Sequence, residues 1–262
     1  MLVIGERING MFKDVGKAIV DQDKQVIQDL AKKQLVAGAD VLDVNVGPAA
    51  ADAVGAMQWL VETIQEAVDL PLALDSTKFE VIEAGLKLVK KKAIINSTSA
   101  KKEKLEKLIP LAKQYGAGLI GLTMGETGIP RDRHQRSEFA AVIVSACMEA
   151  GIDLGGLYLD PIILPVNVAQ PQALEVLEAI REFQLLSDPP PKTVVGLSNV
   201  SQGAEQRSLI NRTFLVMAQA MGLSAAIADP LDKELMDALI TAELLLNKHI
   251  YCASYLDAYK KK

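Results

Sequence analysis

The chain is poor in histidine, cysteine and tryptophan: its 262 residues include two histidines, two cysteines and one tryptophan. Zinc sites are built mainly from cysteine and histidine, so this composition argues against one, and we predict no metal ligands. The cysteines, Cys147 and Cys252, each fall in a helical pattern and have neither the spacing of a disulfide framework nor that of a metal motif. We expect both to be buried, inert thiols.

The chain also lacks a basic excess and any long apolar run. Its 28 lysine and arginine residues are outnumbered by 33 aspartate and glutamate residues, which gives a net charge of −5. Nucleic-acid binding requires a basic surface, so we expect no nucleic-acid partner. No apolar run reaches the roughly 18 residues that a membrane span needs, and the first residues do not resemble a signal peptide. We therefore expect a cytoplasmic protein that does not interact with a membrane.

The chain does have a regular alternation of two kinds of segment. Short apolar runs rich in valine, isoleucine and leucine occur near residues 2–4, 40–46, 71–75, 93–96, 118–123, 156–160, 193–198 and 224–228. They are continuous rather than alternating, which is typical of parallel strands covered on both faces. Between them lie amphipathic segments that predict helices near residues 21–37, 52–68, 78–91, 103–115, 135–150, 171–186, 206–221 and 232–247.

Eight strand–helix units within 262 residues predict an α/β fold of the closed (β/α)8 type, a TIM barrel. An open, doubly wound sheet has the same alternation, but eight units in a chain of this length favour closure. No linker or shift in composition divides the sequence, so we expect residues 1–262 to form a single domain. Glycines that follow four of the predicted helices support these helix ends, because glycine adopts a left-handed conformation most easily: Gly38, Gly116, Gly151 and Gly222.

Polar side chains stand at the ends of five predicted strands. These residues are Asn45, Asp75, Asn96, Asp160 and Asn199. In a barrel of parallel strands the carboxyl ends all meet on one face, which is where such barrels place their chemistry. The sequence therefore predicts that these side chains surround one site.

The strand-end carboxylates have two interpretations, helix cap or ligand contact. Asp52 and Asp232 stand directly before predicted helices and fit the role of N-cap. Asp75 and Asp160 directly follow apolar strand residues while the next helix starts later, so we expect them to contact a ligand. Asp43, which alternates with Asn45 on one strand, fits a structural network as well as a ligand contact.

Amides mixed with acids indicate a particular kind of ligand. The amides of Asn96 and Asn199 donate and accept hydrogen bonds without carrying charge, and a carboxylate accepts two N–H bonds from a guanidine-like edge such as that of a pterin. We therefore expect a flat, hydrogen-bonding heterocycle. A catalytic role for His134, in the predicted loop after the fifth strand, stays open, whereas His249, at the end of the last predicted helix, is interpreted as structural.

Several short motifs resemble those of the pterin-binding barrel family, which includes dihydropteroate synthases and methyltetrahydrofolate methyltransferases. They are L-D-S-T at 74–77, I-N-S-T at 95–98, L-D-P at 159–161, G-E-R-I-N-G at 5–10 and G-L-S-N-V-S at 196–201. The last two are most similar to the methyltransferase branch, and in particular to methyltetrahydrofolate:corrinoid/iron–sulfur protein methyltransferases. The resemblance runs essentially from end to end of the chain and implies a dihydropteroate-synthase-like barrel.

The resemblance also implies roles for individual residues. Asp75, Asn96 and Asp160 would hold the pterin edge, and Asn199 would be the catalytic residue that approaches N5, the atom that bears the methyl group. The other substrate-binding residues carried over are Gly196, Ser198 and Gln202, which would line the same pocket, and Arg207, near the outer part of the folate or the partner face.

The activity so implied is transfer of the N5-methyl group of methyltetrahydrofolate to the cobalt(I) of a corrinoid, in the reductive acetyl-CoA pathway. The corrinoid would arrive on a separate corrinoid/iron–sulfur protein that docks over the strand-end face, with residues 125–136 as a rim. The family also implies a homodimer. Two rival functions remain: a dihydropteroate synthase, disfavoured because residues 226–230 supply no lysine or arginine for a phosphate, and a non-catalytic folate carrier.

Overall fold

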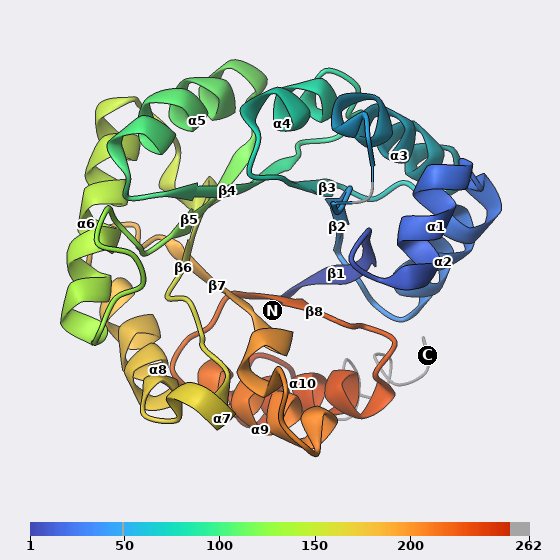
Figure 1. Ribbon diagram of the computed structural model, residues 1–262. Coiled ribbons are helices and arrows are strands. Elements are labelled where there is room, and N and C mark those ends of the chain that lie inside the picture. The colour runs from blue at the N-terminus through green and yellow to red at the C-terminus, as the bar shows by residue number, and fades with distance from the viewer. Residues whose placement is uncertain (49, 252–262) are drawn as a thin grey trace.

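Eight parallel strands form a closed barrel in sequence order in the computed structural model, which describes residues 1–48 and 50–251. Each strand pairs with its neighbours in the chain, and β8 pairs with β1, with helices around the outside (Figure 1). The predicted TIM barrel is confirmed. The strands are β1 (Leu2–Asn9), β2 (Val41–Asn45), β3 (Leu72–Asp75), β4 (Ile94–Ser99), β5 (Gly118–Leu122), β6 (Leu157–Asp160), β7 (Lys192–Gly196) and β8 (Ala225–Ala228).

The helices largely follow the predicted amphipathic segments. They are α1 (Lys13–Asp21), α2 (Lys24–Val36), α3 (Ala53–Ala67), α4 (Phe79–Leu86), α5 (Lys102–Tyr115), α6 (Arg133–Glu149), α7 (Val166–Ala169), α8 (Gln172–Phe183), α9 (Arg207–Ala220) and α10 (Lys233–Leu245). Two short 3-10 helices, η1 (Leu154–Gly156) and η2 (Leu197–Ser201), complete the set. As predicted, Asp52 and Asp232 accept N-cap hydrogen bonds, and the four helix-end glycines have positive φ.

Besides the first strand, which runs beyond residue 4 to Asn9, three predicted elements have wrong boundaries. The helix predicted over 21–37 starts later, at Lys24, and a separate helix, α1, precedes it, because Gln22 adopts a left-handed conformation and Asp23 caps a new helix. The helix predicted over 78–91 ends at Leu86. The strand predicted over 193–198 ends at Gly196, and Ser198 and Asn199 belong to η2.

The barrel interior is built in layers, because successive side chains of a strand point to opposite faces. One buried apolar layer takes one residue from each strand: Ile4, Val41, Ala73, Ile94, Ile120, Tyr158, Val194 and Ala225. Two residues further along each strand, towards the carboxyl ends, stand the members of the next layer: Glu6, Asp43, Asp75, Asn96, Leu122, Asp160, Gly196 and Ile227. A layer of mainly polar side chains thus lies directly against an apolar layer.

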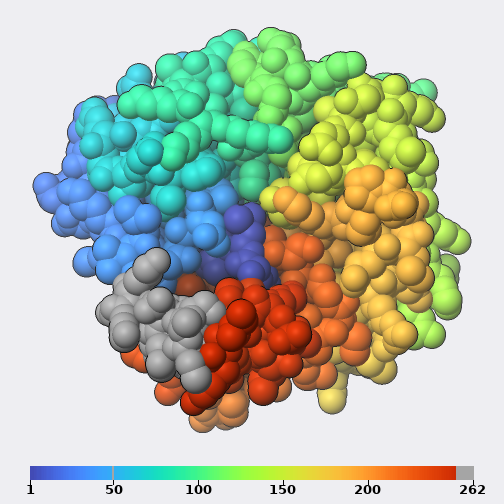
Figure 2. Space-filling model, turned by 180° about the vertical axis from the view of Figure 1, so that it is seen from behind, coloured from blue at the N-terminus to red at the C-terminus, as the bar shows by residue number. Residues whose placement is uncertain are grey.

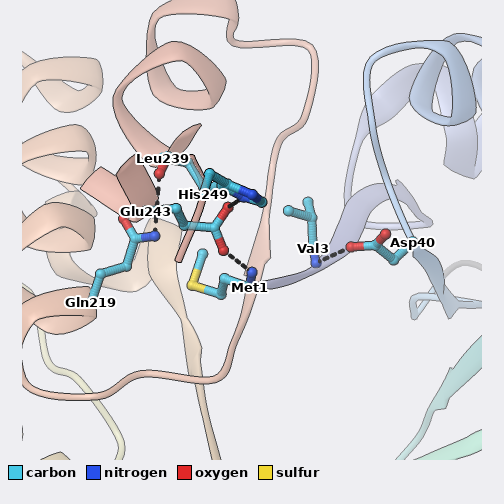
Figure 3. A network of polar contacts seen from close by, with 7 residues as sticks. All are labelled: Met1, Val3, Asp40, Gln219, Leu239, Glu243 and His249. Atoms are coloured by element: carbon cyan, nitrogen blue, oxygen red, sulfur yellow. Dashed lines mark hydrogen bonds and ion pairs between the residues drawn. The ribbon is translucent and has the colours of Figure 1, made fainter. Parts of the chain in front are cut away.

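The opposite face, at the amino ends of the strands, is closed by a small polar network. Figure 2 shows the start of the chain at the centre of that face, beside the red segment of α10. The amino group of Met1 pairs with Glu243, which His249 also contacts at 3.1 Å (Figure 3). His249 lies beyond the end of α10 rather than at it, and this contact fits the structural role expected from the sequence. Over the described residues, no helix is both long enough and apolar enough to cross a membrane.

Candidate active site

The residues predicted to hold a ligand lie together at the carboxyl ends of the strands. Asn45, Asp75 and Asn96 are neighbours in register across β2, β3 and β4. Asn45 Nδ2 donates to Asp75 Oδ2 at 2.6 Å, and Asn96 Nδ2 donates to Asp43 Oδ1 at 3.0 Å. The structural network envisaged for Asp43 therefore exists, and it fixes the orientation of Asn96.

Two of these carboxyl groups lie in one electrostatically coupled pair. Burial raises the pKa of Asp43 well above its usual range, and the nearby Asp75 raises it further. Burial also raises the pKa of Asp75, against which the hydrogen bond from Asn45 acts. Because like charges this close disfavour double ionisation, the pair favours a state in which one carboxyl keeps its proton.

Asp160 sits on the opposite side of the polar layer, at the end of β6. Burial raises its pKa to about 6, although hydrogen bonds from the backbone N–H groups of Ile162 and Gly196 and the charge of Arg136 oppose the shift. Its Oδ1 accepts from Ile162 N at 2.7 Å, across a tight turn in which Ile162 has φ of 62°. A positive φ strains a β-branched residue, so this turn needs support from outside.

The buried Arg136 supplies that support from α6. Its Nε donates to the carbonyl of Pro161 at 2.7 Å, and its Nη2 donates to the carbonyl of Ile162 at 3.4 Å and to Gln172 Oε1 at 2.8 Å. We expect Arg136 to orient Asp160 through the backbone that follows it. Arg136 was expected at the end of a docking rim over residues 125–136, but it has no exposed surface and therefore is not part of such a rim.

Asn199 lies on η2, directly after β7, and its side chain is exposed. Its Nδ2 is 2.9 Å from the place that a Cβ on Gly196 would take, so the amide lies against the end of β7. Ser198 Oγ donates to Glu6 Oε2 at 3.0 Å, which ties the turn to β1. The structure thus brings the predicted residues Gly196, Ser198 and Asn199 into one group.

The two remaining predicted residues follow η2. Gln202 is exposed immediately after the turn. Arg207, at the start of α9, donates from Nε to Ser201 Oγ at 3.2 Å and from a terminal nitrogen to the Ser198 carbonyl at 3.3 Å. Arg207 therefore contacts the turn that carries Asn199, and its expected place near the outer part of the folate or the partner face stays a prediction.

Glu6 is the site residue that the sequence did not indicate. A strand expected over residues 2–4 runs instead to Asn9 and carries one extra residue between Gly5 and Ile8, where its register with β2 shifts. The free N–H of Arg7 in this bulge donates to Gln34 Oε1 at 3.1 Å. Glu6 falls within the G-E-R-I-N-G motif at 5–10, but no role was attached to it, and the early end assigned to this strand concealed its place two positions beyond Ile4.

The two histidines and the described cysteine lie away from these contacts. His134 is exposed in the first turn of α6, not in a loop. Cys147 is buried in α6, and burial raises the pKa of its thiol to about 11, as expected of an inert cysteine. Cys252 falls outside the described residues. Within the described part of the chain, no group of three or more potential ligands is placed to hold a metal ion.

Together these residues form a cluster rich in hydrogen-bond acceptors. Four carboxyl groups, Glu6, Asp43, Asp75 and Asp160, have raised pKa values, and burial is the main cause for each. A ligand that presents several N–H groups would stabilise their ionised forms by hydrogen bonding. Amides beside the carboxyls suit a ring whose edge alternates donors and acceptors.

A closed parallel barrel with a cluster of polar side chains at the carboxyl ends of its strands is typical of a TIM-barrel protein whose site lies on that face. The model of the pterin binding enzyme family matches residues 12–229, so the chain belongs to that family. It is 30% identical over 266 residues to a methylcorrinoid:tetrahydrofolate methyltransferase of Eubacterium limosum, covering 100% of this chain and 97% of the relative.

The chain also matches one part of a longer protein, and it shares its fold with a solved structure of low sequence identity. The methionine synthase of Mycobacterium tuberculosis is 31% identical over 240 residues, which cover 87% of this chain but 20% of that protein. A dihydropteroate synthase of Yersinia pestis, in complex with a sulfonamide drug, has a TM-score of 0.71 at 17% identity, covering 95% of this chain and 94% of that one. At this identity the likeness shows the shared fold.

Proposed function

We propose that this protein transfers the N5-methyl group of methyltetrahydrofolate to the cobalt(I) of a corrinoid bound to a separate corrinoid/iron–sulfur protein, in the reductive acetyl-CoA pathway. The observation that carries the proposal is the grouping of the half-buried Asp75 and the buried Asn96 and Asp160 with an exposed amide, Asn199, at the carboxyl ends of the strands. The relative that matches over 97% of its length, which is named for methyl transfer between a corrinoid and tetrahydrofolate, supports it.

The acceptors would hold the pterin by its N–H groups. Asp75 and Asp160, in their ionised forms, accept from the guanidine-like edge, and Asn96, whose orientation Asp43 fixes, covers a neighbouring ring position. Gly196, Ser198, Gln202 and Arg207 complete the substrate-binding set around η2. The pterin would then lie across the mouth with N5 towards Asn199.

Methyl transfer is a displacement at carbon. The cobalt(I) electron pair forms the new bond to the methyl carbon, and the pair of the broken carbon–nitrogen bond returns to N5. A tertiary amine leaves poorly unless N5 is protonated or strongly hydrogen-bonded, so the enzyme must stabilise positive character there. Asn199 cannot supply a titrating proton, but its carbonyl accepts a hydrogen bond from a protonated N5 as the methyl group leaves, a contact that strengthens in the transition state.

The decisive experiment mixes the protein with methyltetrahydrofolate and cobalt(I) cobalamin without oxygen and follows absorbance. Protein-dependent conversion of the cobalt(I) band to that of methylcobalt(III) supports the proposal. Binding of the folate without conversion, with free cobalamin and with a purified corrinoid/iron–sulfur protein alike, would overturn it and leave the folate-carrier function. Condensation of p-aminobenzoate with a pterin pyrophosphate would instead identify a dihydropteroate synthase.

The same transfer in reverse is a second candidate, because the name of the full-length relative puts the methyl group on the corrinoid at the start. One site lowers the barrier in both directions, so the geometry does not distinguish them. Starting the assay from methylcobalamin and tetrahydrofolate, and comparing the two initial rates with the same partner protein, decides which direction the enzyme favours.

The proposal extends to the assembly. The corrinoid is too large to enter a mouth that already holds a folate, so the partner would dock over the carboxyl ends of the strands, where Asn199 is exposed. The loop after β5 would contribute to the rim through Glu126, Ile129 and Arg131, which are also exposed. We further place the protein in the cytoplasm as a single domain of residues 1–262.

One surface on the side of the barrel is suitable for the contact between the two chains of a homodimer. A groove of about 600 Å³ lies between α7 and α8 on one side and α9 on the other, helices that are adjacent in Figure 1. Large apolar side chains are exposed in and beside it: Val168, Leu174, Leu209 and Met217. A contiguous apolar surface of this kind is typical of a protein–protein contact, and we assign it to a second copy of the chain.

A further inference from the structure

We propose that Glu6 is a positioning residue that sets the orientation of Asn199, acting through Ser198 and the 3-10 turn η2. This inference rests in part on the proposed methyl transfer, for which Asn199 is the catalytic residue. Glu6 lies in the G-E-R-I-N-G motif, but no role has been given to it above. Its carboxylate reaches the turn from the other end of the chain.

The geometry of β1 directs Glu6 to the turn. The extra residue between Gly5 and Ile8 re-aims the side chains of this segment, which is a common use of a bulge beside a site. Gln34 stabilises the bulge by accepting from the Arg7 N–H, and a Cβ on Gly5 would stand 2.4 Å from Gln34 Oε1. A side chain at position 5 would therefore displace the Gln34 oxygen that holds the bulge presenting Glu6 to Ser198.

The turn is held from two sides. Glu6 accepts from the Ser198 hydroxyl, while Arg207 donates to the Ser198 carbonyl and to Ser201 Oγ, which in turn donates to the Ser198 carbonyl at 3.3 Å. Asn199 is the next residue after Ser198, so any movement of Ser198 is transmitted to its backbone. Asn199 is exposed, so apart from its approach to Gly196 its orientation depends on the contacts that hold this turn.

The charge of Glu6 can change near neutral pH. Burial raises its pKa to about 7; the hydrogen bond from Ser198 lowers it, Asp229 after β8 raises it, and the charges of Arg207 and Arg7 lower it. Asp43, on β2, is the other carboxyl that interacts with Glu6. Below neutral pH a protonated Glu6 would donate to the Ser198 hydroxyl instead of accepting from it, and Arg207 would lose an opposite charge beside the turn.

The first test does not depend on methyl transfer. In substrate-free protein labelled with nitrogen-15, the side-chain amide of Asn199 is assigned by its loss in Asn199→Ala and followed by NMR from pH 5 to pH 9. We expect its shift to titrate with a midpoint near 7 in the wild type and to lose that titration in Glu6→Gln. Asp40→Asn, which alters a carboxyl at the amino ends of the strands, is the control and should leave the titration unchanged.

The second test uses the transfer reaction. We expect Glu6→Gln to lower kcat by about 10-fold to 100-fold, the effect of a misplaced catalytic group, while the Kd for methyltetrahydrofolate changes by less than about threefold. Glu6→Asp keeps the charge but shortens the side chain by one methylene, so the carboxylate no longer reaches Ser198. It should lower kcat to the same extent. In a double-mutant cycle with Asn199→Ala the two effects should be strongly non-additive.

Two results would overturn the positioning role: an Asn199 titration that persists unchanged in Glu6→Gln, or losses from Glu6→Gln and Asn199→Ala that simply add. A wild-type protein that shows the Glu6-dependent titration but transfers no methyl group would refute the proposed function and leave the positioning role in place. The reverse pattern, with methyl transfer but no Glu6-dependent titration, would refute the positioning role alone.

Discussion

Gly196 and Asn199 are in such close contact that a Cβ at position 196 would stand 2.9 Å from Asn199 Nδ2. The missing side chain of one residue thus makes room for the amide of the other. Gly196 has φ of −75°, which any residue adopts, so its backbone conformation does not require glycine. Glycine is needed at position 196 because the Asn199 amide approaches so closely.

Gly196→Ala should therefore displace the Asn199 amide without unfolding the protein. We expect kcat for methyl transfer to fall by about 10-fold or more, because small displacements of a catalytic group are costly. The midpoint of urea unfolding should stay close to that of the wild type, since the contact is with the end of a flexible side chain. Wild-type kcat in Gly196→Ala would show that the enzyme tolerates a displaced amide.

Asn199→Ala removes the amide altogether. We expect kcat/KM for methyl transfer to fall by about 10²-fold to 10³-fold, the scale for losing one preorganised polar contact in the transition state. Stopped-flow absorbance of the cobalt(I) band measures the rate directly. A loss below about threefold would remove Asn199 from the mechanism, since that is far less than such a contact contributes.

Folate binding should weaken in acid through Asp160. Its pKa is raised to about 6, so the carboxylate that would accept from the pterin is lost as the pH falls through that value. We expect the Kd for methyltetrahydrofolate to rise below pH 6, and Asp160→Asn to bind weakly with a flatter profile. Equilibrium dialysis between pH 5 and pH 8 measures both. A wild-type Kd that stays constant down to pH 5 would argue against an ionised Asp160 in the complex.

The raised pKa of Glu6 also predicts a change in stability. A carboxyl with a higher pKa in the folded protein favours folding in its protonated form, and this contribution is lost as the pH rises from about 4.5 through about 7. Glu6→Gln, which mimics the protonated form, should be more stable than the wild type at pH 8.5 by on the order of 2–3 kcal/mol. Near pH 4 the difference should vanish.

Urea unfolding at the two pH values measures the free energy of unfolding of Glu6→Gln and the wild type. The exposed Glu126 offers a matched control, because Glu126→Gln removes the same charge without burial and should produce no comparable difference. An equal effect of the two substitutions at pH 8.5 would contradict the assignment to burial.

The last prediction concerns the apolar groove between α7, α8 and α9, to which we assigned a second copy of the chain. The double substitution Leu174→Asp and Leu209→Asp places two charges on exposed apolar positions of α8 and α9. We expect it to convert a dimer into a monomer in sedimentation equilibrium while leaving the far-ultraviolet circular dichroism unchanged. Val20→Asp, on α1, alters an equally exposed apolar residue elsewhere and should leave the dimer intact. Dimers that survive the double substitution would place the contact on another surface.

The sequence by itself determined the barrel and most of the polar side chains at the carboxyl ends of its strands. Strand and helix periodicities are local properties, and a polar residue after an apolar strand marks a strand end wherever the chain goes, which is why Asp75, Asn96 and Asp160 could be predicted. The tertiary structure alone decided what those residues contact. Glu6 and Ser198 meet across 192 positions of the chain, and Arg136 reaches the turn after β6 from 25 positions away. Closure of the barrel brings these distant groups together, and burial in that closed interior then raises the pKa values of its carboxyl groups.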